Sequence, residues 1–235
     1  MRKYALCSPF LPIEIQSEIA KLSSSPCVAV PPSASLPTPV SHHPDMLFFN
    51  RRNSTEIVTS KAYYAVNRRF FDDLGSTHIL LDDTVLGSEY PNDIAFDAIG
   101  INGTLYCLEA HTASSVKAQF SRTVNIKQGY AACSTLILSD RAAVTADSGI
   151  AKALKADGIE VLTVSPSGIA LPGYGCGFIG GASAVINSTA VFFGSLKNHP
   201  DAERIAEFCR RFDITVLDFE HLPLTDYGSI RYIYQ

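Results

Sequence analysis

The chain has 235 residues, of which 46% are apolar, and this is enough to build the core of one large domain. Its net charge of −4 and its isolated basic pairs give no continuous cationic surface, so a nucleic-acid partner is not expected. No apolar run approaches the length of a membrane span, and prolines interrupt the N-terminal apolar stretch before it reaches signal-peptide length. We therefore expect a cytoplasmic protein that folds as a single domain over residues 1–235, without a membrane partner.

Short β-like runs alternate with amphipathic helical runs along the chain, and this pattern predicts an α/β fold. Residues 4–30 predict a strand, a helix and a second strand. Four later segments each predict two strands, a helix and a further strand, and they cover residues 45–81, 93–126, 131–165 and 178–219. The last residues, SIRYIYQ, predict a lone strand.

The lone C-terminal strand would supply the strand that the N-terminal unit lacks. Pairing of the two chain ends would close the five units into a ring without a free sheet edge. The sequence therefore predicts a five-bladed α/β propeller of strand-strand-helix-strand repeats, with pseudo-five-fold symmetry and closed by its N- and C-terminal segments.

A short segment with a histidine or tyrosine marks the start of each unit, and we call these five the start segments. Their anchoring residues follow one another at intervals of 40 to 53 residues. The first strands of a propeller line its central pore, so we expect functional side chains in the start segments. The start segments are residues 42–47, 90–95, 129–134, 173–178 and 226–231.

The five units, with HPDMLFF at the start of one of them, resemble the pentein or guanidine-modifying-enzyme superfamily, and in particular its uncharacterised members. Its catalytic families include arginine and agmatine deiminases, dimethylarginine hydrolases and amidinotransferases. The resemblance implies a cysteine that attacks the guanidinium carbon, a histidine that transfers protons, and carboxylates that hold the cation. A non-catalytic branch shares the fold, so the fold alone does not imply a reaction.

His43 and Asp45 match the His-x-Asp motif of these families, so the resemblance implies that His43 transfers protons and that Asp45 binds a guanidinium group. The alternative is a local turn in which Asp45 caps backbone amides. Asp93 repeats the position of Asp45 in the next start segment, and the two carboxylates would hold a cation across the pore. The alternative for Asp93 is a solvated acid on a loop.

The nucleophile is the point where the chain departs from the family. Tyr232 stands where the catalytic thiol is expected, and a phenol is a poor substitute because its ordinary pKa is about 10. Cys133 and Cys176 lie in start segments and are the remaining candidates, and the alternative for Cys176 is a tight turn with a small buried thiol. We expect all six cysteines to be reduced.

Three functions follow as hypotheses. The first is binding of a small cationic, guanidino or amino-acid-like ligand in the pore, without the usual cysteine-dependent catalysis. The second is a cysteine-dependent amidinohydrolase or deiminase, and the third is a non-catalytic scaffold that docks on a larger assembly. No cofactor and no metal site is expected, because no ligand cluster has suitable spacing, and a protein partner or a homo-oligomer stays open.

Overall fold

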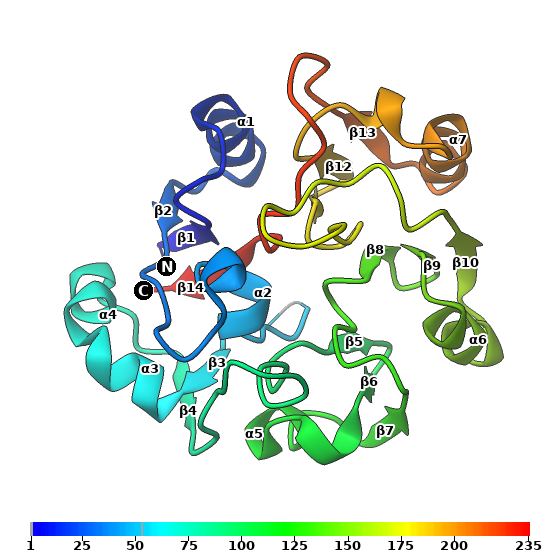
Figure 1. Ribbon diagram of the computed structural model, residues 1–235. Coiled ribbons are helices and arrows are strands. Elements are labelled where there is room, and N and C mark those ends of the chain that lie inside the picture. Colours follow the sequence, from blue (N-terminus) through cyan, green and yellow to red (C-terminus); the bar gives the residue numbers. More distant parts are fainter. Residues whose placement is uncertain (1, 53) are drawn as a thin grey trace.

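In the computed structural model, which describes residues 2–52 and 54–235, the protein has a mixed α/β fold. The strands of the described residues form five small sheets, and Figure 1 shows them arranged around a common centre with most helices on the outside. No helix among these residues is long and apolar enough to cross a membrane.

The two ends of the chain meet in one sheet. Strand β1 (Lys3–Cys7) lies between β2 (Cys27–Ala29) and β14 (Arg231–Tyr234), with the order β14-β1-β2. It pairs antiparallel with β14 and parallel with β2. The predicted pairing of the C-terminal strand with the N-terminal unit is thereby confirmed.

Three further sheets repeat the same pattern, in which the middle strand pairs antiparallel with the first strand and parallel with the third. A helical segment connects the second strand to the third in each unit, which is the connection that parallel pairing requires. Their strands are β5 (Ile99–Ile101), β6 (Thr104–Cys107) and β7 (Arg122–Asn125); β8 (Thr135–Ser139), β9 (Ala142–Thr145) and β10 (Glu160–Thr163); and β11 (Ser183–Ile186), β12 (Thr189–Phe192) and β13 (Thr215–Leu217).

The remaining sheet has two strands, β3 (Ile57–Ser60) and β4 (Ile79–Asp82), which run parallel. The strand predicted from Asp45 onward is wrong over its first part, because Pro44–Leu47 form the short helix α2. Proline fixes φ near the helical value and suits the first helical turn. Only Phe49 follows the prediction, through an isolated antiparallel bridge to Val58.

The other helices lie at the periphery, whereas Figure 1 shows α2 closer to the centre. Their apolar residues face the sheets, as expected for amphipathic helices that cover a core. They are α1 (Ile13–Ser23), α3 (Lys61–Val66), α4 (Arg68–Leu74), α5 (Ser114–Lys117), α6 (Ser148–Ala156) and α7 (Ala202–Arg211).

Candidate functional site

Five buried polar side chains come together at the centre of the protein, four of them from three start segments and one from the residues just after a fourth. None of them is more than 4% exposed, which is unusual for ionisable groups. They are His43, Asp45, Asp97, Cys133 and Asp226, and we call them the central cluster.

His43 and Asp45 enter the cluster because the chain turns at Pro44. The amide of Asp45 donates a hydrogen bond of 3.1 Å to the carbonyl oxygen of Gly228, which ties α2 to the C-terminal segment. Gly228 has a φ of +78°, and a Cβ atom there would lie 2.4 Å from the Cβ of His43. This close approach requires glycine, since any other side chain would push His43 away.

Cys133 and Asp97 hold one another in place beside Asp45. The thiol of Cys133 donates to Oδ2 of Asp45 at 3.1 Å, and its backbone amide donates to Oδ1 of Asp97 at 3.3 Å. The amide of Ala132 donates to the same oxygen of Asp97. Oδ1 of Asp45 and Oδ2 of Asp97 have no hydrogen-bond partner among the described residues.

Asp226 is the third carboxyl group of the cluster. Its oxygens accept hydrogen bonds from the amides of Phe178 at 2.9 Å and Gly228 at 3.0 Å. Nδ1 of His43 lies 3.6 Å from Oδ1 of Asp226 and 4.0 Å from Oδ1 of Asp45. The imidazole therefore stands between two carboxyl groups without a short hydrogen bond to either.

Burial sets the charge of the cluster. Desolvation, followed by the charge of Asp45, raises the pKa of Asp97 to about 8 and that of Asp226 to about 7. The same two causes raise the pKa of the Cys133 thiol well above its ordinary value. Burial lowers the pKa of His43, although Asp45 opposes this effect. Without a bound cation, Asp97 therefore retains its proton near neutral pH and Asp226 retains it in part, beside a neutral thiol and a neutral imidazole.

Asp93 is buried outside the cluster. Its Oδ2 accepts a hydrogen bond of 2.6 Å from the hydroxyl of Tyr130, while Oδ1 has no partner among the described residues. The ring of Tyr130 lies between those of Tyr90 and Phe178, at centroid distances of 5.5 and 5.8 Å. Asp93 is therefore not the solvated loop acid that we kept as its alternative, since it is 2% exposed.

Cys176 and Tyr232 lie elsewhere. Cys176 is exposed and lines a separate pocket of about 200 Å³ together with Asp147 and Ser165. Of the two candidate cysteines, it is Cys133 that contacts Asp45. Tyr232 is partly buried, with Nζ of Lys3 4.4 Å from the centroid of its ring. Burial raises the pKa of this phenol to about 12.

A model of a family of unknown function, DUF6873, matches residues 10–231. The chain belongs to this family. No curated protein matches this DUF6873 chain.

Solved structures similar to the DUF6873 chain cover almost all of it. One is a cysteine-to-serine variant of agmatine deiminase from C. jejuni with substrate bound, at 11% identity and a TM-score of 0.61, with 100% of this chain and 94% of that chain covered. Another is a cysteine-to-serine variant of DDAH from Pseudomonas aeruginosa in complex with citrulline, at 11% identity and a TM-score of 0.56, with 94% and 92% covered. The protein therefore has the fold of the pentein, or guanidine-modifying-enzyme, superfamily.

Sequence reasoning named three members of the central cluster and missed Asp97 and Asp226. Both lie in or next to start segments that the spacing had already identified, and each is followed by the first strand of its unit. An acid shortly before a first strand is the sequence feature that the two share, although this feature alone does not distinguish a buried acid from a solvated one. Among the described residues, no group of three or more His, Cys, Asp and Glu side chains is arranged to hold a metal ion.

Proposed function

We propose that the central cluster binds a small cationic ligand of the guanidino or amino-acid-like class, without the usual cysteine-dependent catalysis. We further infer that the five sheets are the blades of a five-bladed α/β propeller with pseudo-five-fold symmetry, whose axis passes through the cluster. The observation that carries the proposal is the set of three buried carboxyl groups, two of which have an oxygen without a hydrogen-bond partner in the part of the chain that the structure describes.

Buried carboxyl groups favour a cation because an isolated charge in a low-dielectric interior needs a counter-charge and hydrogen bonds. A guanidinium ion supplies both, since its planar set of N–H donors matches carboxylate oxygens. Oδ1 of Asp45 and Oδ2 of Asp97 are the free acceptors. Binding would release the protons that Asp97 and Asp226 hold near neutral pH, so the affinity is expected to rise with pH up to about pH 8.

Two features argue against the usual catalysis. A nucleophilic cysteine reacts as its thiolate, whereas burial and nearby carboxylates raise the pKa of Cys133 well above the ordinary range. Tyr232 occupies the position at which the resemblance places the catalytic thiol, and its phenol has a pKa of about 12. The names of two similar structures mention citrulline and an agmatine deiminase substrate, and these suggest the ligands to test first.

The test is thermal unfolding of the full chain with agmatine, arginine, citrulline, methylated arginines and plain amino acids at millimolar concentration. A ligand of the native state raises the unfolding temperature, and we expect this only with the guanidino compounds and more strongly at pH 8 than at pH 6. Asp45→Asn should abolish the shift, whereas Asp83→Asn, at a side chain that is 87% exposed, should preserve it. No shift with any of these compounds would refute the proposal.

A second candidate function is a cysteine-dependent amidinohydrolase or deiminase, which the 3.1 Å contact between Sγ of Cys133 and Asp45 favours. The thiol proton of Cys133 would pass to His43 as Sγ forms a bond to the guanidinium carbon. His43 would then give this proton to the departing ammonia or amine, and water would cleave the carbon–sulfur bond and restore the thiol. Ammonia or urea release that Cys133→Ala abolishes, and that Cys176→Ala retains, would establish this function. Ligand binding without any release would support binding alone.

A further inference from the structure

A cavity of about 450 Å³ opens beside the central cluster. Its charged lining side chains are basic, whereas those of the cluster are mainly acidic. Its walls come from the first strands β5, β8, β11 and β14 and from residues near position 50. Ala98 and Ala132, which are chain neighbours of Asp97 and Cys133, also line it. The volume lies within the range of small-molecule sites.

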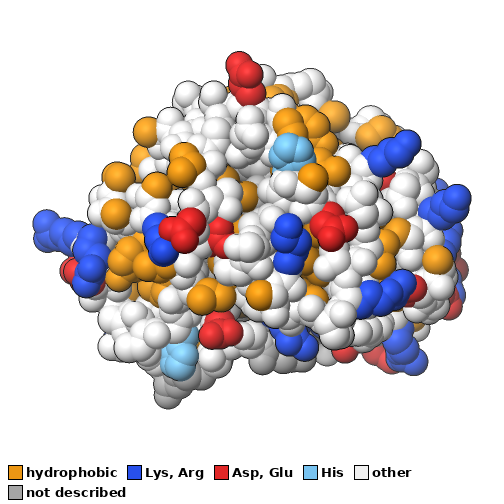
Figure 2. Space-filling model, turned by 90° about the horizontal axis from the view of Figure 1, so that it is seen from below, with side chains coloured by type: hydrophobic (Ala, Val, Ile, Leu, Met, Phe, Trp, Pro, Cys, Tyr) orange, Lys and Arg blue, Asp and Glu red, His pale blue; other side chains and the backbone are white. Residues whose placement is uncertain are grey.

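Of the described residues that line the cavity, four are lysine or arginine and none is aspartate or glutamate. Lys3 and Arg231 come from the paired terminal strands, and Arg51 and Arg52 come from the segment that precedes β3. A concave surface lined by one sign of charge concentrates the field and attracts small ions of the opposite sign. Elsewhere, acidic and basic side chains are interspersed, as on the side face shown in Figure 2.

Three of these four cations lack an acidic partner. Among the described residues, only Arg52 forms a salt bridge, at 3.1 Å from Oδ1 of Asp140. Arg51 donates to the carbonyl oxygen of Gln119, and Arg231 donates to the carbonyl oxygens of Phe48 and Ile230. Carbonyl groups orient these guanidinium groups without neutralising them, so the positive charge remains available to a ligand.

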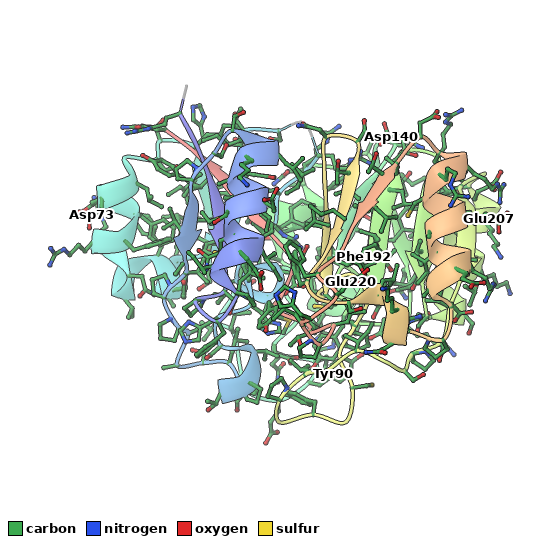
Figure 3. The ribbon with its side chains drawn as sticks, turned by 90° about the horizontal axis from the view of Figure 1, so that it is seen from above. Asp73, Tyr90, Asp140, Phe192, Glu207 and Glu220 are labelled. Atoms are coloured by element: carbon green, nitrogen blue, oxygen red, sulfur yellow. The ribbon has the colours of Figure 1, made fainter. Side chains whose placement is uncertain are left out.

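The cavity lies at the end of the molecule opposite to the aromatic rings of Tyr90 and Tyr130. Arg52 of the cavity wall forms an ion pair with Asp140, whereas Tyr90 packs against Tyr130 at the other end. Figure 3 labels Asp140 and Tyr90 and shows them on opposite sides of the molecule, with Phe192 between them. Arg51 and Arg52 are exposed, so a solute can reach the cavity from this side.

We propose that this cavity binds a small anion that carries two or more carboxylate or phosphate groups. Arginine side chains bind such oxyanions through paired N–H donors, and Lys3 adds a point charge. Several cations without acidic partners favour a multivalent ligand over chloride. This proposal does not rest on the guanidino site, because it is argued from the basic side chains of the cavity wall. The two sites are electrostatic neighbours, since the charge of Arg231 acts on Asp97 and lowers its pKa against the larger effects of burial and Asp45.

The experiment is isothermal titration calorimetry of the full chain with pyrophosphate and, separately, with citrate, at constant ionic strength maintained with sodium chloride. We expect saturable binding of at least one of the two anions, and the one that binds more tightly identifies phosphate or carboxylate as the preferred group. Absence of saturable binding of both anions at millimolar concentration would overturn the proposal.

Two variants test the location. Lys3→Gln and Arg51→Gln should each weaken binding by about tenfold, since each removes a charge-assisted contact. Arg69→Gln is the matched control, because Arg69 is 93% exposed on α4 and outside the cavity, and it removes the same charge. Equal weakening by Arg69→Gln would show attraction to net charge alone and refute the site. Circular dichroism is used to check that each variant is folded. Arg231 is not substituted, because it donates hydrogen bonds to the backbone carbonyl oxygens of Phe48 and Ile230.

Discussion

Asp97 carries a buried carboxyl group whose pKa of about 8 lies well above that of an aspartate in an unfolded chain. The folded protein therefore retains a proton that the unfolded chain releases above about pH 4. The unfolded state binds fewer protons in this range, so the contribution of Asp97 to stability is full below about pH 4 and is lost as the pH rises to about 8. Asp226 contributes in the same direction up to about pH 7.

We predict that Asp97→Asn removes part of this pH dependence. An amide keeps an oxygen to accept from the amides of Ala132 and Cys133 and carries no charge at any of these pH values. The variant should unfold at a higher temperature than the parent protein near pH 8, and at a similar temperature near pH 5. Calorimetric melting across this range measures the effect, and curves parallel to those of the parent would contradict it.

Residue types alone could predict part of the central cluster. His43 and Asp45 form a recognisable motif, and Cys133 lies in a start segment with few alternatives. Asp226 could not be distinguished from a solvated loop acid, because its burial depends on amides of Phe178 and Gly228 that are contributed by distant turns. The pairing of Cys133 with Asp45 is likewise a tertiary contact, for which no local pattern exists.

At the scale of elements, helices and most strands followed the apolar pattern, and two predicted first strands did so only in part. Residues 45–50 and 93–100 read as strands because they are apolar, yet Pro44–Leu47 form a short helix, residues 93–98 form a series of turns, and β5 begins only at Ile99. Tertiary contacts decide these conformations, such as the bond from Asp45 to Gly228. The same turns carry Asp45 and Asp97 into the interior, where a regular strand would alternate its side chains between two faces.

Helix α6 offers a test of local stabilisation. Oδ1 of Asp147 accepts a hydrogen bond of 2.7 Å from the amide of Ile150 and so caps the N-terminus of the helix. Asp147→Ala should lower the free energy of unfolding by about 1 kcal/mol, whereas Asp147→Asn, which keeps the accepting oxygen, should change it by only a few tenths. Urea denaturation of the three proteins measures the difference. Equal losses in both variants would assign the effect to charge and not to capping.

At the scale of the whole molecule, the pairing of β1 with β14 joins the first described unit to the last. The amide of Gln235 donates to the carbonyl oxygen of Arg2 at 2.9 Å, so the two ends of this chain are adjacent. The sequence predicted this pairing because the N-terminal unit lacked a first strand and the C-terminal strand lacked a sheet. The topology was therefore more predictable than the site, since it follows from repeated local patterns.

We predict that a circular permutant folds. It would connect Gln235 to Arg2 through a short Gly-Ser linker and open the chain between Ser167 and Gly168, which lie in an exposed segment between β10 and β11. Its thermal unfolding should remain a single transition within a few degrees of the parent. A chain that ends at Ser229 is the control, and it should lose cooperative unfolding because β1 has no antiparallel partner. Loss of cooperativity in the permutant itself would contradict the pairing.

The same pairing determines how the protein responds to mechanical force. Because β1 and β14 run antiparallel, with Lys3 opposite Tyr234 and Leu6 opposite Arg231, both chain ends emerge at the same end of the seam. Tension applied to the two ends would load the outermost backbone pair first and then each next pair in turn, as a zipper opens, and not all pairs together in shear. The β1–β14 pairing, which joins the two ends of the chain in one sheet, is thus the weakest point of the protein under tension. Tension would open this sheet before the other four.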